Sequence, residues 1–321
     1  MSLTIKGINS PVQGVDDSSL GAVLEAIVSA AKLISGNVQS GMLIERPDPD
    51  GVRNIHGELV HTLDTLGTNT FVNVFKDSQV VAGLVCEELD VETFFDVKDI
   101  SESYFCVLDP IDGTSNADIA ITIGSIFGIF KGTNGNSVLD ARQFLRPAKD
   151  FVAAGYVLYG SSTLLILATP LRVQEFTLDT DKMEFVCTRS DISIPAECPY
   201  YSVNQGYDDL WDDKIKTVVN SIKRGRSLRY VGSLVSDFHR DLIRGGVYLY
   251  PGDTNNPEGK IRLLYEAAVM SYIAHYAGGE ATNGYTSIFN LQPKSIHQRT
   301  PIFIGNSNVI EQIESILRDT T

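Results

Sequence analysis

The stretch YFCVLDPIDGTSN, residues 104–116, decides how this chain of 321 residues is interpreted. The apolar and aromatic run that ends at Leu108 predicts a buried strand, and two acids, Asp109 and Asp112, follow it. Gly113-Thr114-Ser115 comes next. If this turn opens a helix, its free backbone N–H groups would hold a phosphate. Taken alone, a D-P-x-D-G string is as often a surface turn capped by Asp.

A second apolar run ends in acids as well. VVAGLVCEE, residues 80–88, closes with Glu87 and Glu88. Open α/β folds bind their ligands where strands end at one edge of a sheet, so we expect these acids to meet Asp109 and Asp112 there. Four unpaired carboxylates in one cavity would repel each other, and Mg²⁺ or Mn²⁺ would relieve that repulsion. The residues thus favour metal-assisted phosphate-ester hydrolysis, although an isolated Glu-Glu pair is more often a solvated loop.

The remaining pattern predicts a layered α/β architecture. Apolar residues recur at helical spacing over 20–34 and 59–74, with Asp17-Ser18-Ser19 as the cap of the first helix. SIFGIF (125–130) and AAGYVLYG (153–160) read as buried strands. Further helices are expected over 236–244, 263–277 and 308–317, and strands over 246–250 and 302–305. Because residues 190–228 form the least apolar long stretch, we expect subdomains 1–200 and 201–321.

Composition excludes several classes of function. The chain has 26 Lys+Arg against 40 Asp+Glu, a formal charge of −14, so binding to nucleic acid or to an anionic membrane surface is not expected. The four cysteines show no C-x-x-C spacing, which indicates a reducing compartment. We find no signal sequence, and no apolar stretch reaches the roughly 20 residues of a membrane span. A cytoplasmic location is expected, or a plastid if a transit peptide has been removed.

Segments along nearly the whole chain match one family pattern in order. They are NIHGE (54–58), Asp64, Glu87-Glu88, residues 109–116, GSIFG (124–128), AAGYVLYG (153–160), YSVNQGY (201–207), RYVGS (229–233), DFHR (237–240), GVYLYP (246–251), GKIRLLYE (259–266) and HQR (297–299). With them the sequence resembles the fructose-1,6-bisphosphatase / sedoheptulose-1,7-bisphosphatase family of metal-dependent phosphatases. The resemblance implies that family's layered α/β sugar-phosphatase fold in two subdomains, and a homotetramer or at least a dimer.

The resemblance also implies roles for individual residues. It assigns Glu88 and Asp64 to deprotonation of the attacking water. Two to three Mg²⁺ (or Mn²⁺) ions per site would be held by Glu87, Asp109, the Ile111 carbonyl, Asp112, Glu266 and Glu58. Glu266 lies in an otherwise apolar helical pattern, where an unpaired carboxylate would be costly, so the residue pattern itself supports a ligand there.

Other matching residues would bind the two phosphates of a sugar bisphosphate. Gly113, Thr114 and Ser115 match the backbone that holds the phosphate being cleaved, and Arg262 matches a residue near that phosphate and the sugar. The residues that match the distal phosphate site are Asn204, Tyr207, Tyr230, Tyr250 and Lys260, with Arg229 reaching in from a neighbouring subunit. Without the resemblance, these tyrosines would be interpreted as core residues, and Lys260 and Arg262 as solvated charges on a strand.

The chain departs from the family pattern at several positions. Glu58 replaces the usual Asp at the third metal position, and the longer side chain should still coordinate. The usual Ser-Glu-Glu-Asp reads Cys86-Glu-Glu-Leu89, and the usual Asn-Pro is Ala268-Val269. Asp17-Ser18-Ser19 replaces the Thr-Gly-Glu turn of AMP-inhibited members, and Ser103 replaces that site's basic residue. Since an Asp would repel the AMP phosphate, we expect no AMP inhibition.

Three alternatives remain open at this point. The departures favour sedoheptulose 1,7-bisphosphate narrowly over fructose 1,6-bisphosphate, and dual activity is a further option. An inositol-monophosphatase-like enzyme shares D-P-I-D-G-T but should carry a C-terminal Trp-Asp metal motif. Here the single tryptophan, Trp211, lies in DDLWDDK, where no buried helix start is evident. A non-catalytic homologue is disfavoured because the predicted catalytic set is complete.

Overall fold

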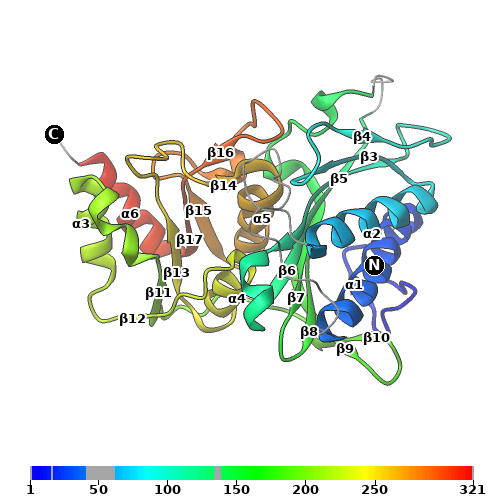
Figure 1. The fold of residues 1–321 in the computed structure, drawn as a ribbon, viewed down its shortest axis with the longest axis horizontal. Coiled ribbons are helices and arrows are strands. Elements are labelled where there is room, and N and C mark those ends of the chain that lie inside the picture. Colours follow the sequence, from blue (N-terminus) through cyan, green and yellow to red (C-terminus); the bar gives the residue numbers. More distant parts are fainter. Residues whose placement is uncertain (1, 16, 41–61, 134–138, 320–321) are drawn as a thin grey trace.

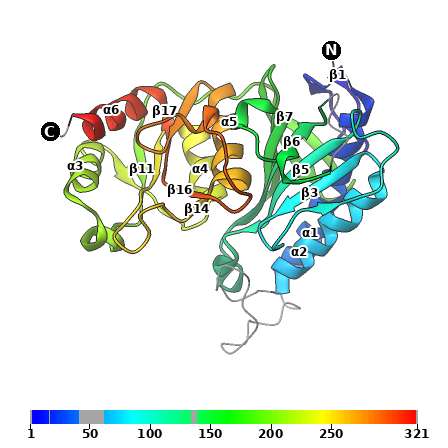
Figure 2. The ribbon, with the colours of Figure 1, turned by 90° about the horizontal axis from the view of Figure 1, so that it is seen from above.

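The chain folds into five alternating layers of helices and sheets (Figures 1 and 2), in a computed structural model that describes residues 2–15, 17–40, 62–133 and 139–319. Two helices, a large sheet, two more helices, a small sheet and a last pair of helices follow one another across Figure 1. The layered α/β fold predicted from the sequence is therefore confirmed. Glu58 and the loop around it lie outside the described residues.

The large sheet has eight strands in the order β10-β9-β8-β7-β6-β5-β3-β4. Only β3 and β5 run parallel, and the other neighbours are antiparallel. The strands are β3 (Val81–Cys86), β4 (Thr93–Phe94), β5 (Tyr104–Asp112), β6 (Ile123–Lys131), β7 (Phe151–Tyr159), β8 (Thr163–Ala168), β9 (Val173–Asp179) and β10 (Glu184–Arg189). β3 and β5 are buried along their whole length, as expected for strands covered on both faces.

Helices α1 (Ser18–Ser40) and α2 (Thr62–Ser78) cover one face of this sheet. Asp17 caps α1 as predicted, because its Oδ1 accepts a hydrogen bond of 2.8 Å from the backbone N–H of Ser19. Among the described residues, α1 is the one helix long and apolar enough to cross a membrane by length and composition. The buried core helices of soluble proteins pass the same test of length and composition. In the structure, the apolar face of α1 is buried in the core between α2 and the large sheet.

Helices α4 (Leu234–Arg244) and α5 (Ala268–Tyr276) form the middle layer, between the two sheets. α4 contacts β6 and β7 of the large sheet and β13 of the small one, while α5 contacts β7 and β15. Both helices belong to a single apolar core that includes side chains of both sheets. This shared core joins the two halves of the chain. The strands of the large sheet come before residue 200 and those of the small sheet begin there, so we propose a boundary between two subdomains at residue 200.

The small sheet has five strands in the order β12-β11-β13-β17-β15, and α3 (Asp213–Ile222) and α6 (Ser307–Arg318) cover its outer face. Its strands are β11 (Tyr200–Ser202), β12 (Ser227–Leu228), β13 (Val247–Tyr250), β15 (Gly279–Thr282) and β17 (Ile302–Asn306). Along β13, Val247 and Leu249 face α3 and α6, whereas Tyr248 faces the shared core. Two small ribbons pair β1 (Ser2–Leu3) with β2 (Val12–Gln13) and β14 (Ile261–Arg262) with β16 (Arg299–Thr300).

Several elements differ from the sequence expectation. β5 continues to Asp112 rather than ending at Leu108, with an irregular register between Asp109 and Asp112. The predicted helix over 263–277 begins with a π-helical turn, Leu263–Ala267, before α5. Trp211 is only 4% exposed and directly precedes Asp212, whose side chain caps α3. A helix therefore begins directly after Trp211, but residues 212–217 at its start are exposed or half-buried, so the interpretation that no buried helix start is evident there is not contradicted.

Candidate active site

Three buried carboxylates meet where β5 ends. Because β3 and β5 are parallel and Cys86 lies opposite Leu108, the acids that follow the two strands reach the same edge of the sheet. The ligand atoms of Asp109, Asp112 and Glu266 lie within 4.8 Å of one another. Glu266 comes from the π-helical turn that precedes α5. The cluster therefore combines residues from the two halves of the chain.

The electrostatics of this cluster suit a divalent cation. Burial raises the pKa of Asp109 well above its usual range, and neighbouring carboxylates add to the shift. Burial also raises the pKa of Asp112, although hydrogen bonds from Ser233 and from the backbone oppose this. Three oxygen donors at this spacing, destabilised by one another's charge, match the donor set that Mg²⁺ and Mn²⁺ prefer.

Arg262 lies beside the cluster and is itself buried. Its guanidinium is 3.4 Å from Oε1 of Glu87, and its backbone N–H donates to Oε2 of Glu266 at 2.5 Å. Glu87, predicted as a metal ligand, therefore lies next to the guanidinium of Arg262. It is also close enough to Asp109 to raise the pKa of that carboxyl. The arrangement gives the pocket one fixed positive charge among its acids.

The turn after Asp112 has the geometry expected of a phosphate-binding segment. Gly113 has a φ of 77°, and a Cβ there would lie 2.7 Å from Cβ of Ser233, so the turn requires glycine. A 3₁₀ helix, η1 (Thr114–Ile119), follows, with Ser115 exposed. The hydroxyl of Thr114 donates to Oδ1 of Asp64 at 2.7 Å and to the Ile111 carbonyl at 3.0 Å.

The two residues predicted to act on the water, Asp64 and Glu88, both precede this turn in the sequence and lie on different elements. Asp64 is buried in the first turn of α2, and its carboxylate is tied to the turn through Thr114. Glu88 follows Glu87 directly after β3 and is half-buried. The structure therefore brings Asp64 to the predicted phosphate turn and leaves Glu88 at the strand edge beside the acidic cluster.

The N-terminus of α4 contacts Asp112, which the sequence analysis did not anticipate. Oδ2 of Asp112 accepts hydrogen bonds from Ser233 Oγ at 2.7 Å and from the backbone N–H of Val235 at 3.0 Å. The backbone N–H of Leu234 lies 3.3 Å from Oδ1. RYVGS and DFHR were matched to the family pattern without a role for Ser233. The signal that could have found it is a Ser cap directly before an apolar helical repeat.

The residues predicted to bind a distal phosphate come from three neighbouring segments. Lys260 Nζ lies 4.6 Å from the ring centroid of Tyr207 and 3.5 Å from its hydroxyl. Burial, aided by nearby negative charge, raises the pKa of Tyr230 to about 12, so its hydroxyl stays a donor at neutral pH. Tyr250 is shifted in the same direction by burial and by Tyr230 and Tyr207. These four side chains therefore share one environment.

Two other predicted phosphate residues are placed differently. Asn204 uses its side-chain oxygen to cap the 3₁₀ helix η4 (Gln205–Leu210), accepting from Gly206 N–H at 3.0 Å. Arg229 is exposed, and its guanidinium lies 5.4 Å from the ring centroid of Tyr200.

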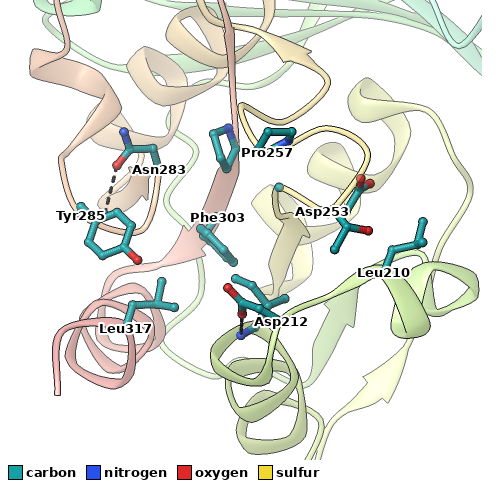
Figure 3. Close-up of a pocket in the computed structure, with 12 residues that line it drawn as sticks. Leu210, Asp212, Asp253, Pro257, Asn283, Tyr285, Phe303 and Leu317 are labelled. Atoms are coloured by element: carbon teal, nitrogen blue, oxygen red, sulfur yellow. Dashed lines mark hydrogen bonds between the residues drawn. The ribbon is translucent and has the colours of Figure 1, made fainter. Parts of the chain in front are cut away.

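A cavity of about 270 Å³ lies elsewhere, beside the loop that joins β13 to β14. Phe303 and Leu317 contribute apolar side chains, and the carboxylates of Asp212 and Asp253 lie on its other side (Figure 3). The loop is anchored here, because Thr254 N–H donates to the Leu210 carbonyl at 3.0 Å. This bond ties the loop that ends at Lys260 to the end of η4, which carries Tyr207. The residues that line the cavity do not include Asp109, Asp112 or Glu266, so the cavity is separate from the acidic cluster.

The N-terminus of α1 is occupied by the chain's own carboxylate. Oδ2 of Asp17 accepts from the Tyr104 hydroxyl at 2.7 Å and from Lys131 Nζ at 3.0 Å. Although burial opposes it, hydrogen bonding to Tyr104, Lys131 and Ser19 lowers the pKa of Asp17 to about 2. The donors that would bind an anion at this helix end are thus already engaged.

Comparison with known proteins identifies the same architecture elsewhere. The family model described as "Fructose-1-6-bisphosphatase, N-terminal domain" matches residues 8–190, and "Fructose-1-6-bisphosphatase, C-terminal domain" matches residues 194–318. A protein of Sulfurihydrogenibium sp. named fructose-1,6-bisphosphatase class 1 is 40% identical over 303 residues, covering 94% of this chain and 92% of the relative. Wheat (Triticum aestivum) chloroplastic fructose-1,6-bisphosphatase is 36% identical, covering 99% of this chain and 81% of the relative.

A solved structure agrees with the sequence comparisons. The crystal structure of Leishmania major fructose-1,6-bisphosphatase in holo form superimposes with a TM-score of 0.88 at 32% identity. The match covers 96% of this chain and 97% of that one. The likeness therefore extends over both sheets and the helices between them.

Proposed function

Because this chain belongs to the fructose-1,6-bisphosphatase family, we propose that it hydrolyses fructose 1,6-bisphosphate to fructose 6-phosphate and inorganic phosphate. The chain is a phosphoric monoester hydrolase of a metal-dependent family. The observation that carries the proposal is the cluster of Asp109, Asp112 and Glu266 next to the Gly113 turn. The narrow preference for sedoheptulose is not confirmed, since the relatives are named for the fructose substrate and support the alternative.

In the proposed site, Asp109, Asp112, Glu266, Glu87 and the Ile111 carbonyl would hold two to three Mg²⁺ ions. When bound, such ions neutralise charge on the phosphate and on the departing oxygen. Backbone N–H groups of residues 113–115 would bind the phosphate being cleaved. Tyr207, Tyr230, Tyr250, Lys260 and Asn204 would bind the other phosphate, with Arg229 contributed by a second subunit of a homotetramer. Arg262 would lie near the sugar, where its charge offsets that of Glu87.

The bond changes are those of phosphate-ester hydrolysis. A water oxygen attacks the phosphorus, and the bond from phosphorus to the C1 oxygen breaks. Glu88 accepts the proton that the water loses, and Asp64, fixed by Thr114, holds the water and the phosphate turn in register. The C1 oxygen leaves with the electron pair of the broken bond and takes a proton from solvent water to become the hydroxyl of fructose 6-phosphate, and Glu88 then releases its proton to solvent.

We also propose that AMP does not inhibit the enzyme, since Asp17 occupies the N-terminus of α1 with its own negative charge. Initial rates measured with and without AMP test this directly, and a rate that falls on adding AMP would overturn it. A cytoplasmic location stays a prediction for cell fractionation to test.

The substrate is tested by comparing kcat/KM for fructose 1,6-bisphosphate and sedoheptulose 1,7-bisphosphate, with inositol 1-phosphate as a third arm. We expect the fructose substrate to give the highest kcat/KM. A higher value for sedoheptulose 1,7-bisphosphate would reverse the substrate assignment and keep the reaction. Turnover of inositol 1-phosphate alone would refute the proposal.

A further inference from the structure

The segment 229–235 connects the two ends of the proposed substrate site. It begins with Arg229, which is assigned to the site of a neighbouring subunit, and with Tyr230, which belongs to the distal phosphate group of this chain. It ends in the first turn of α4, which contacts Asp112. Its position therefore sets the spacing between the acidic cluster and the distal phosphate. Gly232, in the middle, has a φ of 84°, so the backbone turns sharply between the two ends.

Asp237 holds this segment from inside α4. Its side chain is fully buried, at 0% exposure. Oδ1 and Oδ2 each lie 3.0 Å from Val231 N, and Oδ2 accepts from Gly232 N–H at 3.0 Å as well. The carboxylate therefore binds two successive backbone N–H groups before the helix begins, in addition to the cap that Ser233 provides.

Arg240 extends this contact to the rest of the segment. Its guanidinium donates to Oδ1 of Asp237 at 2.8 Å and to the Arg229 carbonyl at 3.2 Å. It also donates to the hydroxyl of Ser202 on β11. The pair of Asp237 and Arg240 thus fixes the backbone of 229–232 against both α4 and the small sheet.

On these contacts we infer that Asp237 is a positioning residue that sets the register between the acidic cluster and the distal phosphate site. Asp112 holds 233–235 from the large-sheet side, and Asp237 holds 231–232 from the helix side. Asp237 has no assigned contact with substrate, so it acts on the distal phosphate site of its own chain through Tyr230. This inference rests on the proposed function, because it presumes a substrate with phosphates at both ends.

The physical cause is the loss of a charged acceptor that three donors share. Without the Asp237 carboxylate, the backbone N–H groups of residues 231 and 232 and the Arg240 guanidinium would lose their charge-assisted hydrogen bonds to it, and the segment would shift to recover partners. A displacement of about 1 Å in a positioning element costs up to about 100-fold in catalysis. The effect should appear at the distal phosphate, since Asp112 still holds the start of α4.

The test compares Asp237→Asn with Asp241→Asn. Both residues are fully buried on α4 next to Arg240, but only Asp237 has hydrogen bonds to Val231 and Gly232. We measure the Kd of fructose 6-phosphate by calorimetry without metal, the Kd of Mn²⁺, KM and kcat, and the thermal unfolding midpoint. Fructose 6-phosphate occupies the distal site alone, so it reports on the segment independently of metal and chemistry.

For Asp237→Asn we expect the Kd of fructose 6-phosphate and KM to rise about 10-fold or more, with the Kd of Mn²⁺ unchanged. Asp241→Asn should leave all of these constants near those of the parent. If Asp237→Asn folds with an unchanged Kd for fructose 6-phosphate, the inference is wrong even if its unfolding midpoint falls. Arg240→Lys keeps the positive charge but loses the planar guanidinium, so it is a second test. It should raise the Kd of fructose 6-phosphate and KM by a smaller factor than Asp237→Asn.

The inference and the proposed function fail in different ways. If the unsubstituted protein neither hydrolyses fructose 1,6-bisphosphate nor binds fructose 6-phosphate, the proposed function fails. If it does both, and both variants match it, only the role of Asp237 fails.

Discussion

Glu88 is the residue on which the chemistry depends most directly. It follows Glu87 at the edge where β3 and β5 end, and it is half-buried, so a water can reach it, whereas Asp109, Asp112 and Glu266 are buried. Asp64 approaches from a different element, α2, through the Thr114 hydroxyl. A carboxylate that accepts a proton in the transition state contributes a factor of about 10² to 10⁴ to the rate.

We therefore expect Glu88→Gln to lower kcat by about 10² or more while leaving the Kd of fructose 6-phosphate unchanged. Glutamine keeps the shape of the side chain and cannot accept the proton. Asp90→Asn is the matched control, because Asp90 is exposed two residues later. A kcat for Glu88→Gln equal to that of the control would remove Glu88 from its assigned role.

Asp241 gives a pH dependence whose sign follows from its burial. Burial raises the pKa of Asp241 to about 7, with Arg240 opposing and Asp237 adding to the shift. Between pH of about 4 and 7, the folded protein therefore binds a proton that the unfolded chain releases. The free energy of unfolding should fall as the pH rises through this window.

Asp241→Asn should remove this loss and make the protein more stable at pH 8 by about 1–3 kcal/mol. Urea unfolding at pH 5 and pH 8 measures it. Asp253→Asn is the opposite case. Burial alone would raise the pKa of Asp253, but hydrogen bonds from Asn256 and Asn255 lower it. This substitution should therefore lower the free energy of unfolding at neutral pH. If Asp241→Asn is the less stable protein at pH 8, its carboxylate is paired better than its burial indicates.

Among the secondary-structure elements, most of those with continuous apolar runs were predicted well, although β8, with the sequence TLLILA, was not assigned. β3, β5, β6 and β7 carry β-branched and aromatic residues between Gly, Asp and Pro, and strands buried on both faces require such runs. β9 and β10 alternate polar and apolar residues instead, and the sequence analysis did not assign them. β15, with the sequence GEAT, has no strand-like composition and is a strand because it pairs with β17.

The same limit explains what was missed at the site. On α4, Asp237 and Asp241 share a helical face with Leu234, Phe238 and Leu242, and all five are buried. Two acids on an apolar stripe indicate buried hydrogen-bonded carboxylates, which helical periodicity alone could have revealed. Their partners, the backbone N–H groups of 231 and 232, depend on how the chain enters the helix. Sequence gives no access to that.

The turn at Gly113 leads to a prediction about an element as a whole. Alanine there would have to adopt a φ of 77° and would place its Cβ 2.7 Å from Ser233, which holds Asp112. We expect Gly113→Ala to lower the free energy of unfolding by about 2 kcal/mol or more and kcat/KM by about 100-fold.

Gly225→Ala provides the matched control for that substitution. Gly225 has a φ of 73°, but a Cβ there meets nothing within 4 Å, so only the backbone cost of about 1–2 kcal/mol remains. Unfolding and kcat/KM measured on both variants separate strain from crowding. Equal losses in the two variants would mean that the contact with Ser233 is relieved without moving the turn.

The net charge of the whole molecule does not describe the charges at the proposed site. A net charge of −14 argues against nucleic acid as a partner, yet the proposed substrate is a sugar carrying two phosphates. The acids of the cluster would hold cations, and Lys260 and Arg262 lie on the segment that leads to Glu266. The site can thus attract an anion within an acidic protein, which net charge alone would have argued against.

The acidic cluster also joins the two halves of the chain, and this predicts an effect of metal on folding. Asp109 and Asp112 belong to the large sheet, whereas Glu266 lies in the π-helical turn before α5, after the first strands of the small sheet. Without a cation, their mutual repulsion and burial destabilise the folded state, as the raised pKa of Asp109 indicates. A cation bound only by the folded chain stabilises it by about 2.7 kcal/mol at a concentration 100 times its Kd.

We therefore expect Mg²⁺ or Mn²⁺ to raise the thermal unfolding midpoint and EDTA to reverse the rise, with the two halves unfolding together because α4 and α5 share one core with both sheets. Glu266→Gln removes one charge from the cluster, so it should raise the midpoint in EDTA while abolishing most of the response to metal. Glu258→Gln, on the exposed loop before β14, is the control and should behave as the parent does. A full metal response in Glu266→Gln would place the stabilising ion elsewhere in the molecule. A midpoint in EDTA below that of the parent would show that Glu266 supports the fold by accepting the hydrogen bond from the backbone N–H of Arg262 rather than through a cation.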